Sequence, residues 1–205
     1  MNNVHPILYS FRRCPYAMRA RMGLAGAQIT YEHREIILRN KPAHMLKISP
    51  KGTVPVLMIP TGEIIDESLD IMLWALKQND PHKWLHNLQE HSIDLINRND
   101  TTFKALLDRY KYPNRFPDED CSNARNDAMS IIKDLETRIK KNGSIHSNKT
   151  TIADIAIFPF IRQFAHVDRD WFYDQKLPST HEWLNTHLES ELFKNTMSKH
   201  PLWEE

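Results

Sequence analysis

Cysteine is scarce in this sequence, which holds two cysteines, Cys14 and Cys121, in 205 residues. Two thiols separated by more than half of the chain form no disulfide framework, so a small disulfide-stabilised secreted fold is excluded. Long apolar runs are also lacking, and none approaches the roughly 20 residues that a transmembrane helix needs. The first residues show no basic region followed by an apolar core. We therefore expect no secretory signal, no membrane span and a cytoplasmic location.

An excess of charge of one sign is missing as well. The 27 Lys and Arg residues nearly balance the 26 Asp and Glu residues, which leaves a net charge of +1. Such a chain has no general attraction to nucleic acid or to an anionic membrane, so neither is expected as a partner.

Histidines are present but scattered along the chain. His82 and His86 lie four positions apart and would share one face of a helix. No third residue near them has the spacing of a metal ligand, so no metal site is expected.

The first 80 residues alternate between strand and helix patterns. Strands are expected at 7–10, 29–38, 54–59 and 63–66, and helices at 15–25, 42–48 and 68–77. The turn Pro60-Thr61-Gly62 joins the last two strands in a hairpin. The order β-α-β-α-β-β-α predicts an α/β domain with a largely parallel sheet and an antiparallel edge.

Strand patterns fade after about residue 80, and helical patterns follow at roughly 84–111, 119–142, 152–166 and 179–198. Thr151 and Asp154 form a capping-box pattern before a stretch, 155–161, that is apolar nearly all round. A helix of that kind belongs in the centre of a bundle. We therefore predict an α/β domain at 1–78, a linker at 79–83 and an all-helical domain at 84–205.

The setting of Cys14 is the most informative feature of the chain. A short apolar run ends in Arg12 and Arg13, and then Cys14 is followed directly by Pro15, which is favoured at the first position of a helix. The thiol would therefore lie where free N–H groups and the positive end of the helix dipole favour an anion. These conditions lower the pKa of a thiol and expose a thiolate nucleophile. The alternative is a small apolar cysteine that packs in a core, and the strand–turn–Cys-Pro–helix context favours the reactive thiol.

Several short motifs extend this interpretation, and they occur in a fixed order: Cys14-Pro15-Tyr16-Ala17, Asn40-Lys41-Pro42, Gly52-Thr53-Val54-Pro55-Val56-Leu57, Asp66-Glu67-Ser68 and Thr151-Ile152-Ala153-Asp154. Together they resemble the glutathione S-transferase superfamily, and within it the cysteine-type, omega-like members. The resemblance covers essentially the whole chain. It implies a thioredoxin-like N-terminal domain and an all-helical C-terminal domain that forms the second wall of the substrate cleft. It also implies glutathione as cosubstrate and a homodimer.

The resemblance also assigns binding residues. Val54-Pro55 would be a cis-proline step, where the backbone of Val54 pairs with the cysteinyl unit of glutathione; the alternative is that Pro55 merely starts an edge strand. Glu67 and Ser68 would hold the γ-glutamyl end, and the alternative for them is an ordinary helix start. Lys41 matches a lysine that contacts the glycyl carboxylate, although a surface lysine often has no such role.

The position of Ala17 narrows the chemistry. Two-cysteine oxidoreductases use Cys-x-x-Cys, and here Ala17 occupies the second cysteine position, so a single-thiol cycle is expected. The omega-like resemblance implies thioltransferase or reductase activity through a mixed disulfide of Cys14 with glutathione, including dehydroascorbate reduction. Cys121 could act as a distant resolving thiol, but the sequence does not place it near Cys14, and an isolated structural cysteine is expected.

Two other functions stay open. One is conjugation, in which the thiol of glutathione attacks a small electrophile with help from a hydroxyl, for which Tyr9 and Ser10 are the candidates at the end of the first strand. The other is a non-catalytic interaction protein with the same fold. The presence of Cys14, Val54-Pro55 and Glu67-Ser68 together disfavours the latter.

Overall fold

The computed structural model describes residues 4–85 and 90–204, and it divides into two compact units. The first unit comprises Met1–Lys83 and Ser190–Glu205, and the second comprises Trp84–Glu189. Residues 190–205 therefore belong with the α/β unit, and not with the helical domain predicted at 84–205. The reason is that α10 (Glu191–Thr196) packs against α1 (Pro15–Gly26), and the segment after α10 pairs with the sheet.

The first unit has the predicted element order. Strand β1 (Ile7–Ser10) comes first and is followed by α1. The next elements are β2 (Glu32–Glu35), α2 (Ala43–Ile48), β3 (Val56–Met58), β4 (Ile64–Ile65) and α3 (Ser68–Gln78). The strand order in the sheet is β2-β1-β3-β4. Only β1 and β2 are parallel, because β3 runs antiparallel to both β1 and β4. The expectation of a largely parallel sheet was therefore wrong, although the antiparallel hairpin at the edge is confirmed.

The second strand is shorter than the predicted span 29–38. Its ladder with β1 ends where β1 itself ends, with Ser10 paired to Glu35 and the Ile36 N–H donating to the Ser10 carbonyl at 2.9 Å. Beyond that point Ile37 forms an isolated bridge with Asn40 across a turn. The strand pairing with β1 therefore stops at this point, although β-branched residues continue beyond Glu35.

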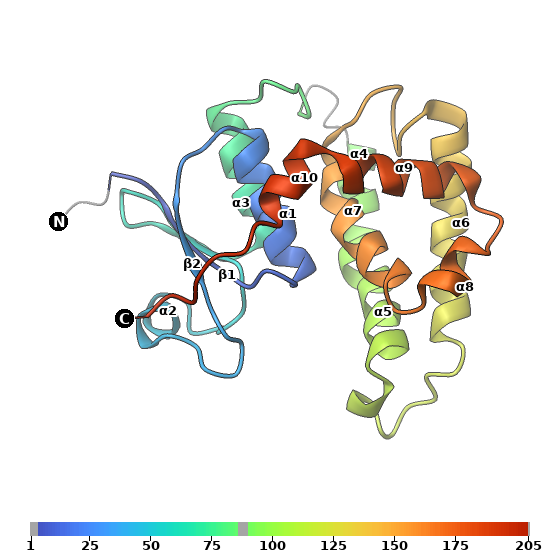
Figure 1. Cartoon of the computed structure of the whole chain (residues 1–205), viewed down its shortest axis with the longest axis horizontal. Helices are drawn as coiled ribbons and strands as arrows, with labels where there is room; N and C mark the ends of the chain where they lie inside the picture. Colours follow the sequence, from blue (N-terminus) through green and yellow to red (C-terminus); the bar gives the residue numbers. More distant parts are fainter. Residues whose placement is uncertain (1–3, 86–89, 205) are drawn as a thin grey trace. The chain divides into compact units, whose positions relative to one another are not determined.

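Helices α1 and α3 lie side by side in the first unit (Figure 1). A Cβ on Gly23 would lie 2.8 Å from the Cα of Met72, so only glycine allows this approach of the two helices. An apolar cluster surrounds Tyr9, Met45 and Val56, and the half-buried side chains of Cys14 and Trp203 pack at its border. The end of β1, the start of α1 and the C-terminal segment therefore share one core.

The second unit is helical. Its helices are α4 (Glu90–Arg98), α5 (Lys104–Lys111), α6 (Ala124–Asn142), α7 (Ile152–Ala165), α8 (Arg169–Tyr173) and α9 (Pro178–Glu189), with a π-helical stretch at Asn99–Phe103 and a 3-10 turn at Pro113–Arg115. The predicted helix at 179–198 is two helices, because the Ser190 hydroxyl accepts the Phe193 N–H at 3.2 Å and starts α10. None of the helices in residues 4–85 and 90–204 has the length and apolar character to cross a membrane.

Helix α7 forms the centre of this unit, as its apolar sequence predicted, and its residues 152–161 are all buried. The capping box is confirmed: the carboxylate of buried Asp154 accepts the Thr151 N–H at 2.8 Å. The same carboxylate accepts the Ile145 N–H at 2.9 Å and the Trp183 indole N–H at 3.0 Å. One side chain thus joins the start of α7 to the preceding loop and to α9.

Candidate functional site

Cys14 lies at the N-terminus of α1, where its sequence setting predicted it. It is the N-cap residue, with extended φ and ψ of −74° and 126°, and Pro15 occupies the first turn. The Cys14 N–H donates to the Phe11 carbonyl at 3.0 Å, and the Cys14 carbonyl accepts the Met18 N–H at 2.9 Å. The first turn of α1 contains no acidic side chain. The thiol is therefore at the positive end of a helix whose first turn carries no competing anion.

The thiol lies beside the predicted cis-proline step. The Val54-Pro55 peptide bond is cis, and the Cys14 Sγ lies 3.8 Å from the Val54 carbonyl oxygen, toward which it donates. Cys14 is half-buried, and both Val54 and Pro55 are buried. The structure thus brings together three of the predicted site residues, although the thiol and Val54 are 40 positions apart in the sequence.

Glu67 and Ser68 form the start of α3, with Glu67 as the N-cap residue. The Glu67 side chain is 63% exposed and pairs with the ammonium of Lys51. Ser68 is 2% exposed, and its hydroxyl accepts a hydrogen bond from the buried guanidinium of Arg19 at 3.4 Å. The Glu67 carboxylate therefore lies at the surface beside Lys51, whereas the Ser68 hydroxyl is buried.

Lys51 is a member of this corner that the motifs did not indicate. Besides Glu67, its ammonium contacts the Asp66 backbone carbonyl at 3.3 Å and the Asp66 carboxylate at 3.8 Å. The Asp66 carboxylate also accepts the Ser49 hydroxyl at 2.8 Å. The available signal was a basic residue shortly before the Val54-Pro55 motif, facing a pair of acidic residues before a helix.

Lys41 lies near the loop that leads to the cis-proline step. Its Nζ is 3.9 Å from the position that a Cβ on Gly52 would occupy, and Gly52 has a φ of +64° that favours glycine. Lys41 is half-buried. Cys14, Lys41, Val54, Pro55, Glu67 and Ser68 consequently all belong to the first unit.

The two hydroxyls considered for conjugation are buried and engaged. The Tyr9 hydroxyl is 2.6 Å from the Nδ1 of His44 and accepts from the guanidinium of Arg34 at 2.6 Å. The Ser10 hydroxyl accepts from the guanidinium of Arg21 at 2.6 Å. Both residues are 0% exposed, so neither presents its hydroxyl at the surface.

Cys121 is in the second unit, and both cysteines are free thiols. It is half-buried and borders a depression of about 440 Å³ together with Tyr110, Arg109 and Arg125. Of these residues, Arg109 forms an ion pair with Glu119 at 2.7 Å, so its guanidinium already has a carboxylate partner.

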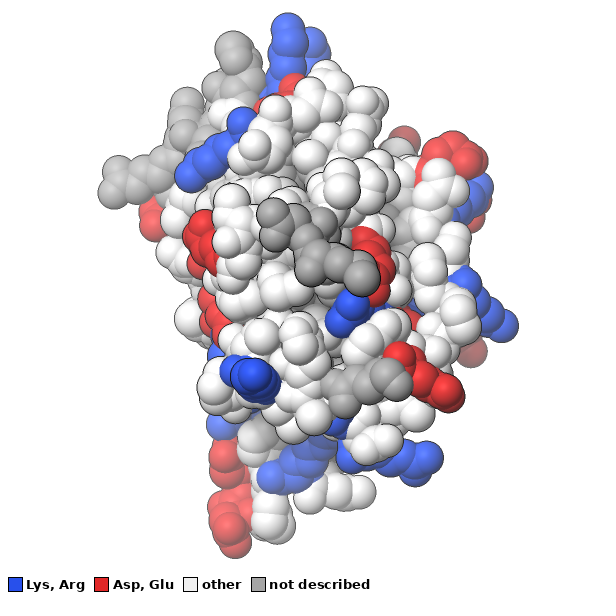
Figure 2. Space-filling view, turned by 90° about the vertical axis from the view of Figure 1, so that its left-hand side faces the viewer, with Lys and Arg blue, Asp and Glu red and all other residues white. Residues whose placement is uncertain are grey.

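No group of three potential metal ligands gathers within residues 4–85 and 90–204. His86, which the sequence paired with His82, lies outside the described residues. On the face shown in Figure 2, basic and acidic side chains are interspersed with uncharged surface. This distribution agrees with the net charge of +1.

Two family models match the chain in the order of its two units. The model of the glutathione S-transferase N-terminal domain matches residues 8–84, and the model of the C-terminal domain matches residues 96–186. The chain belongs to the glutathione S-transferase family. The family assignment and the fold, a thioredoxin-like domain plus a helical domain, are thereby confirmed.

Its curated relatives in the family are distant. The probable glutathione S-transferase DHAR1, cytosolic, of Oryza sativa subsp. japonica is 26% identical over 87% of this chain and 78% of its own length. The glutathione S-transferase omega-1 of Mus musculus is 40% identical, but over only 30% of this chain and 26% of its own length.

Solved glutathione transferases share the fold. The URE2P6 enzyme of Phanerochaete chrysosporium, solved with oxidised glutathione, matches with a TM-score of 0.81 and 17% identity over 94% of both chains. The Omega 3C enzyme of Trametes versicolor matches with a TM-score of 0.78 and 18% identity over 96% of this chain and 85% of its own. At these identities the likeness concerns the fold.

Proposed function

We propose that this protein is a glutathione-dependent thioltransferase or reductase that acts through a mixed disulfide between Cys14 and glutathione. The observation that carries the proposal is the position of the Cys14 thiol, at the N-terminus of α1 and 3.8 Å from the Val54 carbonyl beside the cis-proline step. A cysteinyl unit that pairs with the Val54 backbone brings its sulfur close to the thiol. The helix N-terminus stabilises the thiolate that reacts with it.

The proposed reaction has two thiol–disulfide exchanges. The Cys14 thiolate attacks the glutathionyl sulfur of a mixed disulfide, the substrate S–S bond breaks, and the substrate leaves as a thiolate that takes up a proton. The thiolate of a second glutathione then attacks the glutathionyl sulfur on Cys14. Oxidised glutathione leaves, and the Cys14 thiolate is restored. One substrate disulfide is thus reduced at the expense of one glutathione from solution.

Ala17 supports a single-thiol cycle. It stands where a dithiol enzyme has its second cysteine, and it is 0% exposed. The mixed disulfide on Cys14 therefore has no neighbouring cysteine on α1 that could resolve it. A second glutathione is the natural resolving thiol.

The proposed glutathione site extends from Cys14 to the start of α3. The Val54 backbone and Pro55 would hold the cysteinyl unit, and Lys41 the glycyl carboxylate. Glu67 would receive the γ-glutamyl ammonium, and the N–H groups at Ser68 its carboxylate. Because Lys51 already contacts the Glu67 carboxylate, an incoming ammonium would share that carboxylate with Lys51. The Phanerochaete chrysosporium enzyme of the same fold binds oxidised glutathione, which supports a site of this kind.

Conjugation to small electrophiles is the second candidate, and it receives less support because the Tyr9 and Ser10 hydroxyls are buried and hydrogen-bonded. A thiolate at Cys14 also tends to form a disulfide with glutathione, which competes with conjugation. A non-catalytic role would make no use of the Cys14 thiol at the N-terminus of α1. The helical wall of the substrate cleft, a homodimer and a cytoplasmic location remain part of the proposal.

Incubation with oxidised glutathione tests the proposed intermediate. We expect one glutathionyl adduct per chain, located on Cys14 by peptide mass spectrometry and removed by reduced glutathione. The Cys121→Ser variant is the matched control and should form the adduct to the same extent. An adduct on Cys121 alone, or none on either thiol, would contradict the mechanism.

Replacing Glu67 by glutamine tests the proposed γ-glutamyl contact. Loss of the carboxylate weakens ground-state binding, so KM for glutathione should rise about tenfold while kcat stays within about twofold. Steady-state kinetics with varied glutathione measure both. Glu63→Gln, an exposed carboxylate in the β3–β4 turn, is the control and should leave KM unchanged. An unchanged KM in Glu67→Gln would remove Glu67 from the proposed site.

A further inference from the structure

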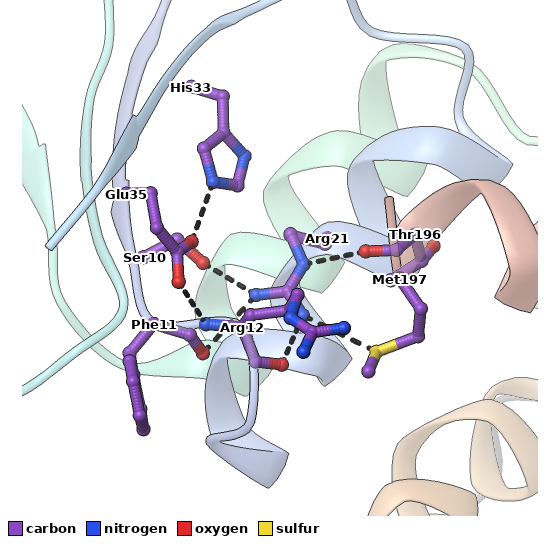
Figure 3. Close-up of polar contacts among 8 residues, drawn as sticks. All are labelled: Ser10, Phe11, Arg12, Arg21, His33, Glu35, Thr196 and Met197. Atoms are coloured by element: carbon purple, nitrogen blue, oxygen red, sulfur yellow. Dashed lines mark hydrogen bonds and ion pairs between the residues drawn. The ribbon is translucent and has the colours of Figure 1, made fainter. Parts of the chain in front are cut away.

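Arg21 is a buried arginine that the proposed reaction does not use. It lies on α1, seven positions after Cys14 and hence about two helical turns along the same face. The residue is 1% exposed, which is exceptional for a charged side chain. A guanidinium buried to this extent requires hydrogen-bond partners for its donors. All its hydrogen-bond partners in the described part of the chain are uncharged, and Figure 3 shows them on two sides.

On one side the guanidinium holds the loop that carries Cys14. It donates to the Ser10 hydroxyl at 2.6 Å, to the Arg12 carbonyl at 2.8 Å and to the Phe11 carbonyl at 3.5 Å. The Phe11 carbonyl is also the acceptor of the Cys14 N–H, at 3.0 Å. Arg21 therefore fixes Ser10, the last residue of β1, and the two residues after it, from which the chain turns toward the thiol.

On the other side the guanidinium contacts the C-terminal segment of the first unit. Its Nε donates to the Thr196 carbonyl at 3.1 Å, and one terminal nitrogen lies 3.8 Å from the sulfur of Met197. Thr196 ends α10, the helix that packs against α1 (Figure 3). One side chain thus connects the loop before Cys14 to Thr196, which lies 175 positions after Arg21.

Glu35 forms a second connection between the same two segments. Its carboxylate accepts the Arg12 N–H at 2.6 Å and contacts the imidazole of His33 at 3.0 Å (Figure 3). Its backbone carbonyl accepts the Trp203 N–H at 2.9 Å. Burial pushes the pKa of Glu35 upward, but the hydrogen bonds from His33 and Arg12 outweigh burial, and the pKa lies below its usual value. Glu35 is therefore a carboxylate at neutral pH, and it braces the Arg12 backbone.

The charge of Arg21 also acts on the thiol. Ionisable groups near it include Tyr31, Glu35, Cys14, Arg12 and His200. Burial lowers the pKa of Arg21, whereas the negative forms of Tyr31, Glu35 and Cys14 oppose that effect. Since the interaction is mutual, the Arg21 cation stabilises the Cys14 thiolate.

We propose that Arg21 is a positioning residue for Cys14, and that the C-terminal segment Thr196–Trp203 holds Arg21 and the loop in place, so that the reactivity of the thiol depends on the end of the chain. The idea rests on the proposed function only in taking Cys14 as the reactive group. Thr196 and Met197 act through Arg21, and Trp203 acts through Glu35.

The test measures the pH dependence of Cys14 alkylation by iodoacetamide, in the Cys121→Ser background and without glutathione. Arg21→Lys keeps the positive charge, but a lysine ammonium lacks the planar, forked donors of a guanidinium and cannot hydrogen-bond the carbonyls on both sides at once. In this variant we expect the apparent pKa of the Cys14 thiol to rise by up to one unit, which lowers the alkylation rate at neutral pH by up to about tenfold. Arg21→Met should show at least the same loss, and circular dichroism checks that both variants are folded.

Arg13→Met is the matched control. Arg13 is exposed and adjacent to Cys14, and its guanidinium lies 5.7 Å from the centre of the Phe11 ring. Loss of an exposed charge should change the alkylation rate by less than about threefold, and less still at high salt. If folded Arg21→Lys has the wild-type pH profile, Arg21 does not position the thiol and the proposal fails.

Trp203→Ala tests the dependence on the C-terminal segment. The change removes a side chain that borders the core and loosens the Trp203–Glu35 connection, so the thiol pKa should rise in the same direction as in Arg21→Lys. A wild-type profile in this variant would remove the C-terminal segment from the proposal. Because alkylation needs no glutathione, a shifted profile without any glutathionyl adduct rejects the proposed function alone, whereas a normal adduct with an unshifted profile rejects the Arg21 proposal alone.

Discussion

Replacing Cys14 by serine is expected to lower glutathione-dependent disulfide reduction by roughly a thousandfold or more, to the background rate. A hydroxyl at the N-terminus of α1 remains protonated at neutral pH, and it forms no disulfide with glutathione. The side chain is nearly isosteric and only half-buried, so the fold should be retained. Initial rates with a glutathionylated peptide, measured at saturating glutathione, give the effect directly.

The matched control is Cys121→Ser, which should keep the wild-type rate because the proposed single-thiol cycle uses Cys14 alone. A conjugation assay with chlorodinitrobenzene adds a second readout to both variants. A gain of conjugation in Cys14→Ser would show that both chemistries use one glutathione site. Reductase activity that survives in Cys14→Ser would overturn the proposed mechanism.

Replacing Asp154 by alanine is expected to destabilise the protein by about 4 kcal/mol, because several buried donors lose a charged acceptor at once. These donors are the Ile145 N–H, the N–H and hydroxyl of Thr151 and the Trp183 indole N–H, at 2.8 to 3.0 Å. Asp154 itself is 0% exposed, so water cannot replace the carboxylate without opening the core. Urea unfolding followed by circular dichroism measures the change in unfolding free energy.

Two further variants complete this experiment. Asp154→Asn keeps the volume and one oxygen acceptor, so it should be destabilised by less than Asp154→Ala. Asp127→Ala removes an exposed carboxylate from the first turn of α6 and should change stability by less than about 0.5 kcal/mol. An equal free energy of unfolding for Asp154→Ala and Asp127→Ala would show that the capping box of Thr151 and Asp154 does not anchor α7.

Much of the candidate site could be predicted from local sequence. Cys14 follows a short strand and precedes Pro15, and these neighbours alone place the thiol at a helix start. The helix start at Glu67-Ser68 and the capping box of Asp154 follow from equally short patterns. Such features depend on backbone propensity and on hydrogen bonds between near neighbours, which a sequence displays directly.

The contacts of these residues could not be predicted in the same way. The pairing of Lys51 with Glu67 and of Arg19 with Ser68 joins residues 16 and 49 positions apart, so both pairs form only when α1, the loop before β3 and α3 pack together. The sheet was misjudged for a related reason. Strand direction depends on how β3 enters next to β1, and the alternation of strands and helices does not specify this.

The sequence by itself determined the family, the element order of the first unit and the position of Cys14 at a helix start, because each depends on residues that are close along the chain. Only the tertiary structure decided what surrounds the thiol. It brought the Val54 carbonyl to 3.8 Å from Cys14, and it buried Arg21 between the loop at Phe11 and the carbonyl of Thr196. The physical reason is that a buried guanidinium must satisfy its donors wherever the packed chain supplies acceptors, and here it found them at both ends of the first unit.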